Sequence, residues 1–168
     1  MNKIELRPIK LDKDYAEKWN EINKDFCNLY VDGKKMTDTL YRIGGMGAKL
    51  KDPYFQVLKY TEEYYDDNIT TDPKRKPHLS GCWCIIDNNG VEKVTVRHFD
   101  HLYLQGGQIF SVNNKYYNIE TGELYGDSCY KTMSTKNFIF IDNSYDSDQS
   151  KQGVIQVTKA TGESKLIQ

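Results

Sequence analysis

Two cysteines and two histidines near the middle of the chain have the chemistry of metal ligands. Cys82 and Cys84 lie in one strand-like segment, and His98 and His101 follow the next segment. Thiolate and imidazole groups are common ligands of structural Zn²⁺. However, Cys-x-Cys followed by His-x-x-His is not a common spacing for structural zinc, so small core thiols and exposed imidazoles are the better interpretation. We therefore expect neither a metal ion nor another cofactor.

The register of one hairpin decides which face of the sheet His98 shares. A two-residue turn ending at Gly90 pairs Cys82 with Arg97 and leaves His98 on the opposite face. A three-residue turn with Gly90 in the left-handed conformation puts His98 on the cysteine face instead. Both registers are open at this point.

A glycine-rich segment has residues that could cradle a phosphate group. It contains Gly44, Gly45 and Gly47, with Arg42 and Lys49 as flanking cations. The phosphate-binding loop signature requires Gly before the Lys and Ser or Thr after it, and here Ala and Leu occupy those places. A flexible connection or a bulged turn is the preferred alternative.

Other polar groups receive structural interpretations. An EF-hand loop beginning at Asp146 would need Gly and Glu where the chain has Lys151 and Val157, so the Asp-rich segment is interpreted as a loop between strands. A dyad of Cys129 or Ser128 with a histidine has no local support. The basic run at residues 74–76 follows an acidic cluster that offsets it. We assign no catalytic residue.

Composition bounds the class of protein. With 168 residues, 38% of them hydrophobic and 28% charged, the chain is long enough for one domain with a proper core. Its thirteen tyrosines favour a β-rich fold, in which the ring lies on the sheet and the hydroxyl reaches water, or a recognition surface. We select Tyr103, Tyr116 and Tyr125 as candidates for binding a partner.

Charge and hydropathy limit the partners. The formal net charge is −1, so no overall field attracts nucleic acid or anionic lipid. The first residues lack an apolar leader, and no long apolar run crosses a membrane. We expect a cytoplasmic protein with reduced thiols that binds neither nucleic acid nor membrane.

The N-terminal half predicts mixed structure. Alternation over residues 3–9 predicts an edge strand, and the spacing of Tyr15, Trp19 and Ile22 predicts a helix over residues 12–24. Strands are expected at 26–31 and 34–43, joined by an Asp32-Gly33 turn. Residues 54–65 fit a helical face better than a strand, and residues 66–77 are expected to form a loop.

After Leu79 the chain predicts an antiparallel meander of short strands. The clearest hairpin runs from Trp83 to Val94, with Asn89-Gly90 at its turn. Strands are expected near 81–87, 91–97, 101–105, 108–112, 115–119, 123–126, 137–142, 153–158 and 163–167. Turn signals such as Gly106-Gly107, Asn113-Asn114 and Thr121-Gly122 separate them.

The hairpin resembles one unit of the WG-repeat family. The pattern of that family is Trp-Gly, two apolar residues, Asp, two variable residues and Gly. Residues 83–90, Trp-Cys-Ile-Ile-Asp-Asn-Asn-Gly, resemble it. Phe99-Asp100 lies where such repeats often carry an aromatic-Asp pair. Residues 115–124 and 153–167 resemble degenerate copies without the Trp, and Cys84 replaces the second residue of the motif. The turn glycines Gly90, Gly122 and Gly162 are 32 and 40 residues apart. The resemblance implies a β-repeat scaffold used for interaction.

These observations predict a single mainly β (α+β) domain over residues 1–168. Residues 1–78 form a smaller α-containing N-terminal part, and residues 79–168 form an antiparallel β-meander of repeated hairpins. The expected function is a non-enzymatic interaction module that binds another protein. The alternative is a small-molecule or nucleotide-binding protein or enzyme that uses residues 44–49.

Overall fold

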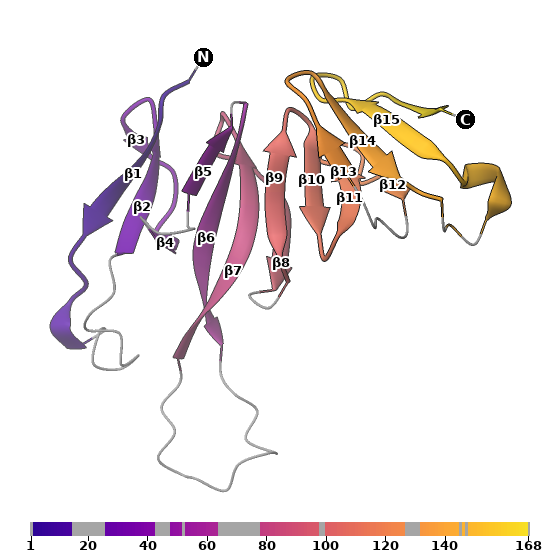
Figure 1. Cartoon of the computed structure of the whole chain (residues 1–168). Coiled ribbons are helices and arrows are strands. Elements are labelled where there is room, and N and C mark those ends of the chain that lie inside the picture. Colours follow the sequence, from indigo (N-terminus) through magenta and orange to yellow (C-terminus); the bar gives the residue numbers. More distant parts are fainter. Residues whose placement is uncertain are drawn as a thin grey trace, which may run out of the picture. The chain divides into compact units, whose positions relative to one another are not determined.

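The described part of the chain consists almost entirely of antiparallel strands (Figure 1). The computed structural model describes residues 2–14, 26–42, 48–51, 53–63, 78–97, 100–126, 132–144, 146 and 148–167. Its strands form three sheets, named here sheets A, B and C. The mainly β class is confirmed. The predicted helix over residues 12–24 lies mostly outside the described residues, of which only Lys13 and Asp14 are helical in that range.

Sheet A has eight strands. They are β1 (Ile4–Ile9), β2 (Phe26–Val31), β3 (Lys34–Lys35), β4 (Leu40–Arg42), β5 (Ala48–Lys51), β6 (Tyr54–Glu63), β7 (His78–Asp87) and β8 (Glu92–Arg97). The order is β1-β2-β4-β6-β7-β8, while β3 pairs with β2 and β5 with β6. β1 is an edge strand, as predicted, and its Pro8 lies opposite Cys27, a placement that an edge strand tolerates.

The preference for a helix over residues 54–65 is wrong, because β6 occupies Tyr54–Glu63 and the two remaining residues lie outside the described part of the chain. Three consecutive residues of β6, Gln56, Val57 and Leu58, are all buried, so both faces of the strand are covered. Burial on both faces removes the polar–apolar alternation by which a strand is recognised in a sequence. The Gln56 amide is satisfied by donating to the Leu102 carbonyl at 2.9 Å and accepting from the Leu104 N–H at 3.0 Å.

The β7–β8 hairpin combines the two registers considered above. The Gly90 N–H donates to the Asp87 carbonyl, and Gly90 has φ +79°, so the turn is the three-residue form. A bulge between Ile85 and Ile86 then shifts the register, so that Cys82 pairs with Arg97, as the two-residue turn predicted. The bulge therefore cancels the offset that the longer turn introduces.

Packing divides the chain into two compact units. Unit 1 is Met1–Lys49 with Val57–His98, and unit 2 is Leu50–Gln56 with Phe99–Gln168. The boundary predicted from the sequence follows residue 78, whereas the last boundary between these units along the chain follows His98. The reason is that β7 and β8 belong to sheet A, so the hairpin packs with the N-terminal strands.

Unit 1 has apolar packing on both faces of sheet A. One face holds a cluster of Phe26, Leu58 and Tyr60, in which the Phe26 and Tyr60 rings meet edge to face at 5.1 Å; Trp83 packs against this cluster. The opposite face buries Cys84 and Ile86. β7 is therefore covered on both sides near its middle.

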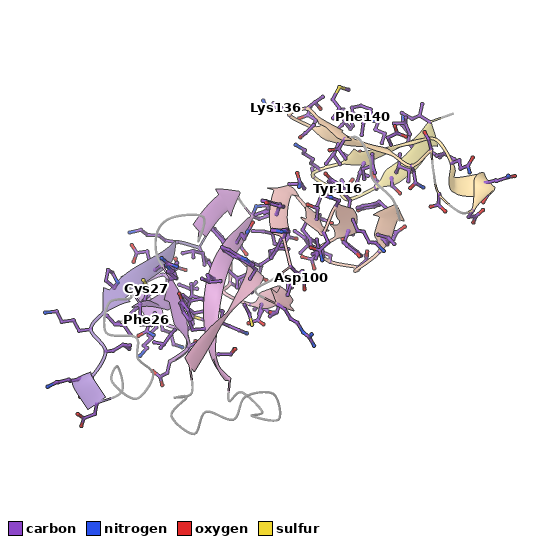
Figure 2. All side chains as sticks on the ribbon, turned by 60° about the horizontal axis from the view of Figure 1, so that its bottom comes forward. Phe26, Cys27, Asp100, Tyr116, Lys136 and Phe140 are labelled. Carbon is purple, nitrogen blue, oxygen red and sulfur yellow. The ribbon has the colours of Figure 1, made fainter. Side chains whose placement is uncertain are left out.

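Unit 2 contains two four-stranded meanders (Figures 1 and 2). Sheet B comprises β9 (Leu102–Gly106), β10 (Ile109–Val112), β11 (Lys115–Asn118) and β12 (Leu124–Gly126). Sheet C comprises β13 (Thr132–Ser134), β14 (Phe138–Asp142), β15 (Val154–Thr158) and β16 (Ser164–Ile167), and a short 3₁₀ helix, η3 (Gln149–Lys151), precedes β15. These strands lie close to their predicted bounds, and β13 is an addition that the sequence analysis did not predict.

Sheets B and C share one buried core. Ile109, Tyr116 and Tyr125 of sheet B cluster with four aliphatic residues of sheet C, namely Ile139, Ile141, Ile155 and Val157. Backbone bonds also join the turns of the two sheets, since the Gln108 N–H donates to the Lys159 carbonyl at 2.7 Å. Unit 2 is thus held together by side-chain packing and by contacts between turns.

Candidate functional site

The predicted phosphate-binding segment is only partly described. Arg42 ends β4 and is exposed, and Lys49 lies within β5. Gly44, Gly45 and Gly47 lie outside the described residues. Ligand binding by this segment therefore stays a prediction.

The three selected tyrosines have different environments. Tyr103 is exposed, whereas Tyr116 and Tyr125 are buried in the core shared by sheets B and C. The Tyr125 hydroxyl donates to the Gly162 carbonyl at 2.6 Å and accepts from the Asn118 amide at 3.0 Å. Tyr116 and Tyr125 are therefore core residues of unit 2, although Tyr125 also lines a groove that is described below. Binding of a partner by these tyrosines stays a prediction. Tyr103 keeps an accessible ring.

The cysteine pair is not arranged with other ligands in the described residues. No group of three His, Cys, Asp or Glu side chains in that part of the chain could hold a metal ion. Burial is the main cause that raises the pKa of the Cys84 thiol to about 12. Because a nucleophile or metal ligand must be a thiolate, Cys84 is a poor candidate for either role at neutral pH. His98 lies outside the described residues.

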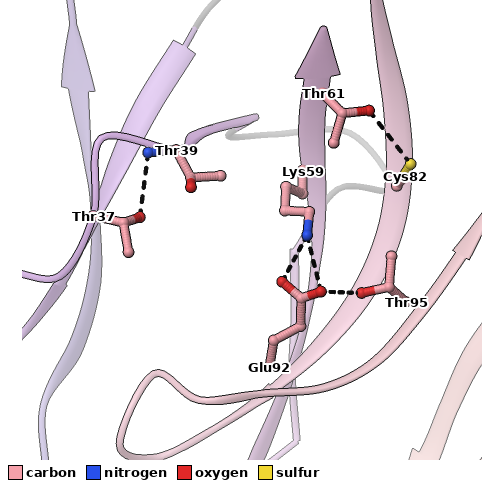
Figure 3. A network of polar contacts seen from close by, with 7 residues as sticks. All are labelled: Thr37, Thr39, Lys59, Thr61, Cys82, Glu92 and Thr95. Carbon is pink, nitrogen blue, oxygen red and sulfur yellow. Dashed lines mark hydrogen bonds and ion pairs between the residues drawn. The ribbon is translucent and has the colours of Figure 1, made fainter. Parts of the chain in front are cut away.

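A polar network crosses β6, β7 and β8 of unit 1 (Figure 3). The Lys59 ammonium donates to both oxygens of Glu92, at 2.8 and 2.7 Å, and the Thr95 hydroxyl donates to the same carboxylate. The Cys82 sulfur lies 3.8 Å from the hydroxyl oxygen of Thr61. Each charged group of the network thus faces a partner of opposite sign.

The Glu92 carboxyl shows how this network acts on ionisation. Burial opposes its ionisation, but the hydrogen bonds from Lys59 and Thr95 outweigh burial, so its pKa is lowered. A carboxyl with a lowered pKa is ionised at neutral pH and is a weak general base. The network therefore stabilises the β6–β8 arrangement and does not have the perturbed acid–base pair of a catalytic site.

The acidic residues between β14 and β15 stabilise their own loop. The Asn143 amide donates to Asp146 at 2.9 Å, and Asp146 accepts from the Asp148 N–H at 2.8 Å. Asp148 caps η3 by accepting from the Ser150 N–H at 3.0 Å. These bonds match the turn-forming role expected for this segment.

An open groove of about 500 Å³ lies between the edge strands β12 and β16 of unit 2. Leu124 and Leu166 line it and are 39% and 37% exposed. Among the described residues that line it, Glu123, Asp146, Asp148 and Lys165 are charged, which gives three carboxylates against one ammonium and a formal charge of −2 for this part of the lining. The groove thus combines apolar contact with an excess of negative charge.

The second surface is the outer face of sheet C, which points away from the core. Cross-strand pairs share a face, and Met133 pairs with Phe140 and Val154 with Ile167, while the neighbouring residues Ile139, Ile141 and Ile155 are in the core. The outer face therefore carries Met133, Phe138, Phe140, Val154 and Ile167, interspersed with the polar residues Asp142, Gln156, Thr158 and Lys165; Phe140 is labelled in Figure 2. Met133 is 60% exposed, and Val154 and Ile167 are exposed as well. Grouped exposed apolar side chains are typical of interaction surfaces.

Neither surface follows from the sequence alone. The alternation of apolar residues in β14 and β15 was visible, but it does not say which face of a sheet is covered. The groove joins residues about forty positions apart, such as Leu124 and Leu166. One sequence signal was present: Leu166 and Ile167 are adjacent in β16, so apolar side chains lie on both faces of this strand.

Comparison with other proteins gives no relative. Within the described residues, no helix has the length and apolarity needed to span a bilayer. No protein-family model matches the chain, and no curated protein or solved structure is significantly similar to it.

Proposed function

We propose that this protein is a non-enzymatic interaction module that binds another protein through the outer face of sheet C. The observation that supports this proposal is the group of five apolar side chains on that face, three of them exposed: Met133, Phe138, Phe140, Val154 and Ile167. Fully burying a side chain of this size contributes ~1.5–3 kcal/mol, so covering several of them can stabilise a complex.

The WG-like hairpins support the same proposal. The turns at residues 118–123 and 158–163 have the same hydrogen bonds, because the Gly122 N–H donates to the Asn118 carbonyl and the Gly162 N–H donates to the Thr158 carbonyl. The two glycines also have nearly equal φ values, +71° and +72°. Recurring hairpins of this kind are typical of scaffolds that present surfaces for binding.

Affinity capture with matched variants tests the proposal. Met133→Glu and Ile167→Glu add charge to the outer face, and Val91→Glu, at a site 53% exposed in unit 1, is the control. Quantitative mass spectrometry of proteins captured from native lysate should show a protein that is retained by the wild type and by Val91→Glu and is at least tenfold depleted with both outer-face variants. Capture profiles that are identical for all four proteins would contradict the proposal.

A further inference from the structure

We infer that the groove beside β16 receives an extended peptide segment of the partner, carrying basic side chains, which adds to sheet C as a further strand. This inference rests on the proposed function and names the kind of partner. It depends on three observations: the open edge of β16, the exposed leucines of the groove and the charge of its lining.

The backbone of β16 has hydrogen-bonding groups directed to the groove. The Thr158 N–H donates to the Glu163 carbonyl, which makes this pair a hydrogen-bonded one. In an antiparallel ladder such pairs alternate with non-bonded pairs. The next bonded pairs therefore involve Lys165 and Ile167, and the N–H and C=O groups of Ser164 and Leu166 point away from β15.

These outward groups lie at the edge of the sheet. β16 is the last strand in the order β13-β14-β15-β16, and no strand in the described part of the chain pairs with its outer side. Ser164 and Leu166 also line the groove. An exposed strand edge of this kind is a template for pairing with another chain, which is the basis of recognition by strand addition.

The side chains of the groove select the class of peptide. Leu124 and Leu166 offer apolar contact to one side chain of an added strand. The described lining residues have a formal charge of −2, from Glu123, Asp146 and Asp148 against Lys165, and complementary charge favours a segment with Arg or Lys. The volume of about 500 Å³ is within the ~300–1,000 Å³ range of ligand sites.

The geometry predicts which peptide amides bind β16. Residues directly opposite each other on paired strands share a face, so the peptide residues whose side chains enter the groove also form the backbone bonds with Ser164 and Leu166. A suitable probe is the fluorescein-labelled heptapeptide Thr-Arg-Val-Leu-Val-Arg-Thr, in which Arg, Leu and Arg share one face. Its central Leu amide should donate to β16, and its Val amides should point away.

Fluorescence anisotropy with the purified full chain measures binding of this probe. An ester in place of the central Leu amide should weaken binding at least fivefold, because it removes one donor, whereas an ester at the first Val should leave binding within twofold. Replacing both arginines by glutamine should weaken binding at least fivefold. Equal binding by the two ester peptides, or no binding by the parent probe, would overturn strand addition; equal binding by the glutamine peptide would overturn the basic preference.

A protein variant tests the same edge from the other side. Leu166→Pro removes an N–H that points to the groove and that β15 does not use, a change that edge strands tolerate. We expect an unchanged far-UV spectrum and at least a tenfold loss of probe affinity, while Leu166→Thr, which keeps the N–H, loses less. If Leu166→Pro does not fold, binding of the ester peptides to the wild-type protein still tests strand addition. A negative probe result leaves the capture experiment on the outer face as a separate test of the proposed function.

Discussion

Trp83 is the residue whose environment matters most for the β7–β8 hairpin. Trp83 and Ile85 are two positions apart in β7, so their side chains lie on the same face of the strand. The structure has Trp83 partly buried against the cluster of Phe26, Leu58 and Tyr60, whereas Ile85 is fully buried. Trp83 therefore joins the hairpin to β2 and β6 but keeps some contact with water.

Trp83→Ala should lower the free energy of unfolding by ~2 kcal/mol, below the ~3–5 kcal/mol for emptying a fully buried aromatic site, because part of the ring is already in water. Urea unfolding at neutral pH measures the change. Val91→Ala, at an exposed position, is the control and should stay within ~0.5 kcal/mol of the wild type. An unchanged midpoint for Trp83→Ala would mean that the ring does not stabilise unit 1.

At the scale of elements, the turns of unit 2 show that one local conformation can have different packing. Gly122 and Gly162 have equivalent hydrogen bonds and similar positive φ values. A Cβ at Gly122 would meet nothing within 4 Å, whereas a Cβ at Gly162 would lie 2.1 Å from the Asn118 side-chain nitrogen. That nitrogen donates to the Tyr125 hydroxyl, so it belongs to a buried network.

This difference predicts the outcome of two alanine variants. Gly122→Ala should destabilise the protein by ~1–2 kcal/mol, the cost of a side chain in the left-handed conformation. Gly162→Ala should cost ~1–3 kcal/mol more, because Asn118 must shift and the core is overpacked. Thermal unfolding of both variants in parallel measures the difference, and equal melting temperatures would show that the turn at 158–163 does not pack on Asn118.

At the scale of the whole molecule, buried ionisable groups in both units link stability to alkaline pH. Burial is the main cause that raises the pKa of Cys84 from 9.0 to about 12 and that of Tyr41 from 10.0 to about 12. Burial also raises the pKa of Tyr125 in unit 2. In each case the folded protein retains a proton that the unfolded chain releases.

The stability contributed by these groups is present below pH 9 and is lost as the pH rises from 9 towards 12, since the unfolded chain then binds fewer protons. Each group that differs in protonation contributes a slope of up to ~1.4 kcal/mol per pH unit. Urea unfolding between pH 8 and 11 should show this fall. In Cys84→Ala the slope above pH 9 should be smaller, and an unchanged slope would show that the thiol is not buried in solution.

Much of the fold after Leu79 was predictable because its signals are local. Short alternating strands and turns with Gly or Asn depend on side-chain period and on positive φ, and both can be read from a few adjacent residues. Gly90, Gly107, Gly122 and Gly162, with Asn113 and Asn114, do adopt positive φ in the structure. The hairpins and the mainly β class thus follow from the sequence by itself.

The tertiary structure decided what the local signals leave open. Residues 54–63 form a strand because β6 pairs with β4 and β7 in sheet A and is buried on both faces at Gln56, Val57 and Leu58, which no local period records. Tyr103 and Tyr116 are residues of the same type, so the sequence does not distinguish them. Tyr116 is buried because it packs in the core shared by sheets B and C, whereas Tyr103 is exposed. The groove between β12 and β16 exists because two strands distant in sequence become edges at one place. Burial and edge position depend on contacts between distant residues, so they arise only when the sheets pack.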